Sequence, residues 1–139
     1  MNMQHWKAPN GQVYGFDADD PSQLAKLADL QAQSPGTWTN VTGNWPPPPT
    51  QAEQLSALEG AVQQYLDQKA QVRGYDSAAS CISYLNSSNA TWKADATAMN
   101  TWRDAVWGLC FANEASVKAG TTPMPTAAQL IADLPAAPW

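Results

Sequence analysis

Apolar side chains recur every three or four residues through most of the chain after residue 50, a spacing typical of helices. The first such segment follows Thr50, which forms the capping-box pattern of a helix start with Glu53. It ends at Arg73-Gly74, because glycine favours the conformation that closes a helix. Its predicted buried stripe comprises Leu55, Leu58, Val62, Tyr65, Leu66 and Val72.

Three further helices are predicted in the same region. A short one begins with Asp76 as its N-cap and buries Ala79, Ile82 and Leu85. A long one covers about residues 90–119 and ends at Gly120. The last follows Thr126, which forms a second capping box with Gln129, and it carries Leu130, Ile131 and Leu134.

The long helix has apolar residues around more than half of its circumference. At about 100° per residue, one stripe comprises Trp92, Met99, Val106, Cys110, Asn113 and Val117. Trp102 and Leu109 lie on one side of that stripe, and Trp107 and Phe111 on the other. Such a helix is either central to its bundle or covered by its own bundle on one side and by another chain on the other. We expect the second arrangement, because the remaining helices can hardly enclose it.

Two residues in this helix need a particular explanation. Gly108 costs about 1 kcal/mol relative to alanine, which is typical of a place where another backbone approaches closely. Arg103 lies near the apolar stripe and needs a carboxylate or carbonyl partner. It either forms an internal salt bridge with a helical aspartate such as Asp67 or Asp76, or anchors an interface with another protein.

The first 45 residues are typical of a small α+β unit. "MQHW" and "QVYGF" predict two strands around Asn10-Gly11, a hairpin signal because both residues tolerate positive φ. A helix then starts with Asp20 as N-cap, Pro21 at its first position and Gln23 completing a capping box. Its predicted buried stripe is Leu24, Leu27 and Leu30. "TWTNVTGNW" predicts a closing strand, with Trp38 or Trp45 covering the sheet.

Four consecutive prolines, residues 46–49, favour a stiff polyproline spacer. The predicted class is therefore α+β. A small N-terminal ββαβ unit (1–45) is joined by a polyproline linker (46–49) to an all-α domain of three to four helices (50–139).

Composition and charge exclude several functions. The net charge is −5, with −2 in residues 1–49 and −3 in residues 50–139, so no basic surface is available for nucleic acid. No apolar segment is long enough to cross a membrane, and the N-terminus lacks the plan of a signal peptide, so we expect a cytoplasmic protein. Only 14% of residues are charged, against about 25% in typical domains, while tryptophan occurs seven times. This combination favours a protein that binds another protein.

The sequence offers no catalytic, cofactor-binding or metal-binding constellation. His5 is the only histidine, and the phosphate-loop, esterase and metalloprotease motifs are missing. Cys81 and Cys110 are predicted to be reduced, buried thiols. We therefore expect no enzymatic activity, no cofactor and no small-molecule substrate.

Three motifs occur in order in the second half: Gly74-Tyr75-Asp76, "WRDAVW" at 102–107, and Pro123-x-Pro125-Thr126. In this context, "VRGYDSAASCISYLNSSNATWKADATAMNTWRDAVWGLC" and "VKAGTTPMPTAAQLIADLPAAPW" resemble a helical domain common in tailed-phage tail-fibre and fibre-assembly proteins. The resemblance covers about residues 50–139. The first fifty residues resemble more loosely the start of tail-fibre assembly chaperones, with a short β-rich unit, "W-P-x-P" and then a helix.

The resemblance implies a non-enzymatic chaperone that helps a trimeric phage tail-fibre protein to fold and trimerise. It would act in the host cytoplasm during assembly, and would reach the virion tail fibre if it stays bound. The alternatives are a structural virion component that joins fibre and baseplate, and a small hydrolase or lectin-like module that stacks sugars on its aromatic residues. The protein-binding candidates are Trp107 and Arg103 in the long helix, and Trp6 and Trp38 in the N-terminal unit.

Overall fold

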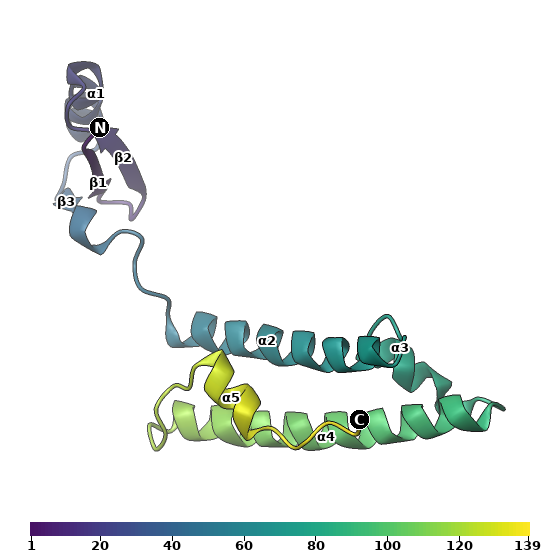
Figure 1. Cartoon of the computed structure of the whole chain (residues 1–139). Coiled ribbons are helices and arrows are strands. Elements are labelled where there is room, and N and C mark those ends of the chain that lie inside the picture. The colour runs from purple at the N-terminus through teal and green to yellow at the C-terminus, as the bar shows by residue number, and fades with distance from the viewer. The chain divides into compact units, whose positions relative to one another are not determined.

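The computed structural model describes residues 1–139 and divides into two compact units, Met1–Pro49 and Thr50–Trp139. The first contains a three-stranded antiparallel sheet and one α-helix, and the second contains four α-helices (Figure 1). The predicted α+β class is therefore confirmed. Each unit is built around its own set of buried residues, so each is described by itself.

The sheet of the first unit has the strand order β2-β1-β3. The hairpin strands are β1 (Met3–Lys7) and β2 (Val13–Asp17), and β3 (Thr39–Asn40) pairs with the other edge of β1. Helix α1 (Pro21–Gln33) connects β2 to β3. The predicted hairpin and helix are thus present.

The closing strand is shorter than predicted. Only Thr39–Asn40 pairs with β1, and a 3-10 turn, η1 (Thr42–Asn44), follows. The side chain of Asn40 accepts a hydrogen bond from the backbone N–H of Thr42 at 3.0 Å, and the Thr42 hydroxyl accepts one from the backbone N–H of His5 at 2.9 Å. These side-chain bonds replace the ladder bonds of a continuing strand.

The hairpin turn uses its two signal residues differently. Gly11 takes a positive φ of 88°, and its N–H donates to the carbonyl of Ala8 at 2.9 Å. Asn10 keeps a negative φ and instead accepts a hydrogen bond from the N–H of Gln12 through its side chain. Only the glycine therefore needs the left-handed conformation.

Helix α1 begins as predicted, but its capping box is absent. Asp20 is the N-cap, and its carboxylate accepts a hydrogen bond from the N–H of Ser22 at 2.8 Å. The side-chain oxygen of Gln23 instead accepts from the N–H of Asp17 at 2.8 Å. Gln23 thus ties the helix to the end of β2, while the N–H of Asp20 donates to the carbonyl of Asp17 at 3.2 Å.

The core of the first unit is small. Its buried apolar residues are Ala8, Phe16 and Leu27. Leu30 is half-buried, and Leu24 is 41% exposed, so the predicted three-leucine stripe is wrong at Leu24. A sheet with one two-residue strand has too little area to cover a 13-residue helix.

The second unit is organised by two long antiparallel helices, α2 (Gln51–Val72) and α4 (Ala90–Lys118), which run side by side in Figure 1. Helix α3 (Ala78–Ile82) and the 3-10 turn η2 (Ser83–Asn86) connect them, and α5 (Ala127–Asp133) packs against α2. Both predicted capping boxes, at Thr50–Glu53 and Thr126–Gln129, are present. Even α2 and α4 lack the apolar length that a membrane-spanning helix requires.

The core lies along the seam of these helices. Its members are Leu55, Leu58, Val62, Leu66, Ala70, Ala78, Cys81, Met99, Trp102, Val106, Val117 and Leu130. Val72 was predicted in this stripe but is 75% exposed. It follows Leu66 by six positions, which places it about 120° around the helix from that residue. Trp92, predicted in the α4 stripe, is 48% exposed at the end of the helix, where the ring of Tyr84 contacts it.

The start of α3 differs from the prediction. Ser77, not Asp76, is the N-cap, and its hydroxyl accepts a hydrogen bond from the N–H of Ser80 at 3.0 Å. Asp67 of α2 accepts a second one from the N–H of Ala78 at 2.9 Å. The short helix is thus oriented from α2. Ala78 and Cys81 face the core, Ile82 and Leu85 are half-buried, and the predicted core residue Ala79 is exposed.

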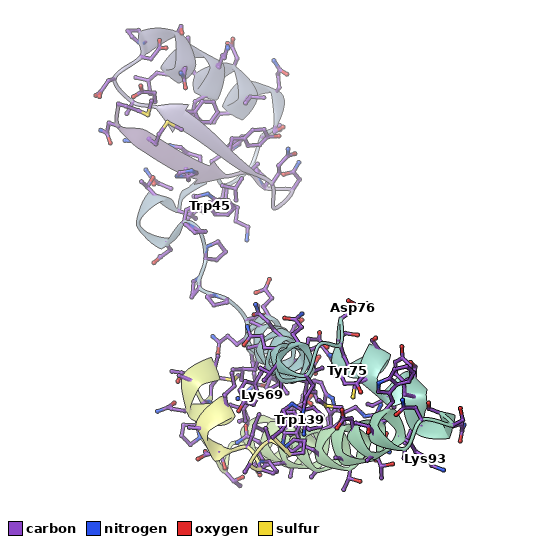
Figure 2. The ribbon with its side chains drawn as sticks, turned by 45° about the vertical axis from the view of Figure 1, so that its right-hand side comes forward. Trp45, Lys69, Tyr75, Asp76, Lys93 and Trp139 are labelled. Carbon is purple, nitrogen blue, oxygen red and sulfur yellow. The ribbon has the colours of Figure 1, made fainter.

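The C-terminal segment after α5 returns along the core. The indole N–H of Trp102 donates to the carbonyl of Pro135 at 2.8 Å, and that of Trp139 donates to the carbonyl of Lys69 at 2.8 Å. Figure 2 shows Trp139 beside Lys69 of α2. The guanidinium of Arg73 lies 4.9 Å from the centre of the Trp139 ring. Trp139 therefore holds the last residues against α2.

Candidate protein-binding site

Helix α4 presents two stacked aromatic rings on its surface. Trp107 is half-buried, whereas Phe111 is 58% exposed, the largest exposure of any aromatic side chain in the protein. Residues four apart lie on the same face of a helix, and the two ring centres are 5.9 Å apart with an angle of 29° between their planes. These two rings form the centre of a surface that we call the Trp107 surface.

A hollow between α2 and α4 lies on one side of these rings. Its lining is mainly apolar, with two carboxylates and one amide: Leu55, Leu58, Val62, Trp107, Cys110, Phe111, Leu130, Glu59, Glu114 and Asn113. A second hollow is lined by Glu59, Arg103, Asp104, Trp107 and Phe111. Trp107, Phe111 and Glu59 border both hollows, so the aromatic pair forms a ridge between them. The Trp107 surface comprises this ridge and the two hollows.

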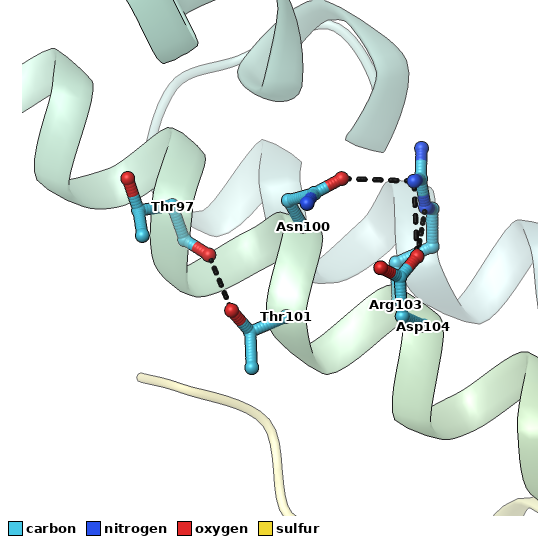
Figure 3. A network of polar contacts seen from close by, with 5 residues as sticks. All are labelled: Thr97, Asn100, Thr101, Arg103 and Asp104. Carbon is cyan, nitrogen blue, oxygen red and sulfur yellow. Dashed lines mark hydrogen bonds and ion pairs between the residues drawn. The ribbon is translucent and has the colours of Figure 1, made fainter.

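Arg103 has a different partner from the two that the sequence suggested. Its guanidinium donates to the carboxylate of Asp104 at 3.0 Å and to the side-chain oxygen of Asn100 at 2.8 Å, as Figure 3 shows. The carboxylate of Asp67 accepts a hydrogen bond from the N–H of Ala78, and no salt bridge joins Arg103 to Asp76. Arg103 thus forms an internal salt bridge with a helical aspartate, but the partner is its neighbour Asp104 and neither of the two examples that the sequence suggested.

Arg103 still lies where the interface prediction needs it. It borders the second hollow together with Trp107. Its role as a protein-binding residue stays a prediction. Gly108, in contrast, is exposed, and a Cβ built on it meets no atom within 4 Å. The sequence predicted that another backbone approaches Gly108 closely, and within this chain that prediction is wrong.

No family model, curated protein or solved structure matches this chain. The functional assignment therefore rests on this surface and on the sequence motifs. In "WRDAVW", Trp102 and Val106 are buried in the core, whereas Arg103 and Trp107 reach the surface. That motif supplies both packing and exposed groups.

The N-terminal candidates belong to the other unit and lie close to its sheet. The indole of Trp6 donates to the side-chain oxygen of Gln4 at 3.2 Å. The indole of Trp38 donates to the carbonyl of Ser34 at 3.1 Å, and its ring centre lies 5.7 Å from that of Tyr14. Both are half-buried, so part of each ring is accessible. Trp38 therefore covers part of the sheet, as one of the two predicted alternatives proposed.

The thiols and the histidine do not assemble with other groups into a reactive site. No cluster of three or more His, Cys, Asp or Glu side chains is arranged to hold a metal ion. Cys81 and Cys110 are free, and burial raises the pKa of both thiols, which keeps them protonated at neutral pH. His5 stacks on Trp45 with their ring centres 5.5 Å apart.

Two of the residues that border both hollows, Phe111 and Glu59, were not among the sequence-predicted site residues. Phe111 was placed beside Trp107 on the helical wheel, and its position one turn later was the available signal. Glu59 carries no such signal. It follows the buried Leu58 in α2, and only the packing of α2 against α4 brings it to the aromatic pair.

Proposed function

We propose that this protein is a non-enzymatic phage tail-fibre assembly chaperone, which binds the fibre protein and assists its folding and trimerisation. The observation that carries the binding role is the exposed Trp107–Phe111 pair beside an apolar hollow. The assignment of the partner as a tail fibre rests on the motif resemblance over residues 50–139.

An exposed aromatic pair of this kind is suited to a protein interface. Monomeric proteins bury most of their large apolar side chains, and contiguous exposed ones mark interaction sites. Tryptophan is enriched among residues that dominate binding energy, and truncating such an anchor typically costs about 2 kcal/mol or more. Trp107 is half-buried in its own unit, so it is held in place and still has surface to offer.

The proposed partner has a physical need for such a surface. Fibre chains are rich in β-structure, and their strand edges and apolar faces are exposed before the trimer forms. A chaperone that covers apolar surface at this stage suppresses incorrect pairing. The low content of charged residues, 14%, and the seven tryptophans accord with this role.

Coexpression with the tail-fibre protein that the proposal assigns as the partner tests it. Wild-type protein should give soluble trimeric fibre, and its omission should not. Trp107→Ala should keep its helical circular dichroism and Tm but reduce the yield of soluble trimer at least tenfold, since it removes an anchor. Trp92→Ala is the matched control, because Trp92 is also an exposed tryptophan of α4 but does not line the Trp107 surface.

Further variants show which of the two units binds the fibre protein. Trp6→Ala and Trp38→Ala report on the N-terminal unit. If all three candidate alanine variants fold and still deliver soluble trimer, tryptophan-mediated binding is wrong. If fibre solubility is independent of this protein, the chaperone function is wrong. A fixed stoichiometry in finished particles, with fibre that trimerises unaided, would identify the structural adaptor instead.

A further inference from the structure

We infer that the Trp107 surface binds an apolar segment that also carries a lysine or arginine, and that Glu59 selects this positive charge. The inference rests on the proposed protein-binding function and specifies the chemistry of the bound segment. It comes from the charges that border the two hollows.

Glu59 is the only charged residue that borders both hollows of the surface. It lies on the exposed side of α2, one position after the buried Leu58. Because Trp107 and Phe111 also border both hollows, any segment that covers the two rings lies next to Glu59.

The other charges near the ridge are already paired within the chain. Arg103 bonds to Asp104 at 3.0 Å, and Lys118 forms an ion pair with Glu114. The Glu59 carboxylate has no hydrogen bond and no ion pair. The uncompensated charge of the surface is therefore negative, in a helical unit whose net charge is −3 from eight acidic and five basic residues.

This charge determines which segment can bind. A partner that covers Phe111 removes water from Glu59, and an unpaired carboxylate loses favourable solvation. A lysine or arginine in the partner offsets the lost solvation by pairing with the Glu59 carboxylate, whereas an acidic residue adds repulsion. The faces of Trp107 and Phe111 also attract a cation. An apolar side chain of the same segment packs on the two rings, because the hollow lined by Leu55, Val62 and Leu130 has room for only about one water-sized group.

A ribosome-displayed library of random short peptides, panned against the full-length protein, tests the inference. Peptides recovered on wild type should combine an aromatic or large aliphatic residue with a nearby lysine or arginine. Peptides recovered on the Glu59→Lys variant should instead carry aspartate or glutamate near the apolar residue. The matched control is Asp76→Lys, which makes the same charge change at an exposed loop position that does not line the surface (Figure 2), and it should recover the wild-type class.

A recovered peptide then gives a quantitative test by calorimetry. Glu59→Gln should weaken its binding about two- to fivefold, the range expected for one partly exposed ion pair. Glu59→Lys should weaken it further, and exchanging the peptide's basic residue for glutamate should restore binding to that variant. Trp107→Ala should abolish binding in every case. High salt should weaken wild-type binding more than that of Glu59→Gln.

Several results would overturn the inference. They are recovery of no peptides above background, of peptides without basic residues, or of the same peptides on wild type and Glu59→Lys. None of these outcomes bears on the coexpression experiment, which tests the chaperone function separately. Soluble fibre that depends on Trp107 but not on Glu59 would retain the chaperone function and reject the charge selection, whereas fibre that never depends on the protein would reject the function itself.

Discussion

Tyr75 illustrates how a single residue joins separate elements. It lies in the loop after α2, and its hydroxyl donates to the carboxylate of Asp95 in α4 at 3.0 Å. The guanidinium of Arg73 lies 3.9 Å from the same carboxylate, and it also covers the ring of Trp139. These contacts connect the end of α2, the start of α4 and the C-terminal segment. Gly74, with a φ of 87°, provides the turn that brings Tyr75 inward.

The first residue-scale prediction concerns the titration of Tyr75. Burial, followed by the hydrogen bond to Asp95, raises the pKa of its phenol from 10.0 to about 12. Because the folded state raises this pKa, the stabilisation is fully present below about pH 10 and is lost as the pH rises through about 12. Tyrosinate absorbance should show a step near pH 12 that Tyr75→Phe removes. A titration curve that Tyr75→Phe leaves unchanged near pH 12 would contradict this environment for Tyr75.

At the scale of elements, α2 and α4 each contain one glycine far from their ends. Gly60 lies in α2 and Gly108 in α4. Glycine in a helix interior loses more backbone entropy on folding than alanine does. Because a Cβ meets nothing within 4 Å at either position, neither helix needs the missing side chain for packing within this chain.

We therefore expect Gly60→Ala and Gly108→Ala to stabilise the helical unit by about 0.5–1 kcal/mol each. Thermal and denaturant unfolding provide the measurement. Gly74→Ala is the contrasting control. It also meets open space, but its φ of 87° strains any residue with a side chain, so it should destabilise the protein. A loss of stability at Gly60 or Gly108 would show that the helix requires glycine there.

At the scale of the whole molecule, the chain is a pair of unequal units. The second buries twelve residues in one cluster, whereas the first buries three apolar residues. Small cores give marginal stability, because conformational entropy offsets most of the gain from burial. The helical unit is therefore expected to hold its fold by itself, and the N-terminal unit to be the less stable of the two.

A fragment of residues 50–139 tests this expectation. It retains Thr50 and Glu53, so the capping box that starts α2 is preserved. It should remain helical and melt cooperatively, with a Tm close to that of the helical transition in the full chain. A molten or insoluble fragment would show that residues 1–49 are required for the helical fold and that the proline segment is not a domain boundary.

The sequence by itself determined most features that depend on residues close in the chain. The capping boxes at Thr50–Glu53 and Thr126–Gln129 and the helix end before Gly120 were predicted and are present. They could be predicted because the donor, the acceptor and the required φ lie within one turn of each other. Hydrophobic spacing likewise placed Val106 in the apolar stripe, where it is buried, because helical periodicity determines which residues share a face.

Only the tertiary structure decided which neighbour each face meets. In the folded chain Val72 and Trp92 are exposed, and Arg103 pairs with Asp104. The carboxylate of Asp67 accepts a hydrogen bond from the N–H of Ala78, and Glu59 lies beside Trp107. Helical periodicity orients a side chain on its own helix, but it does not determine the partner helix, its register or the place where it ends. The candidate site depends on this packing of one helix against another. The sequence identified Trp107 as an apolar flank, and the packing of α2 against α4 placed hollows and an unpaired carboxylate around it.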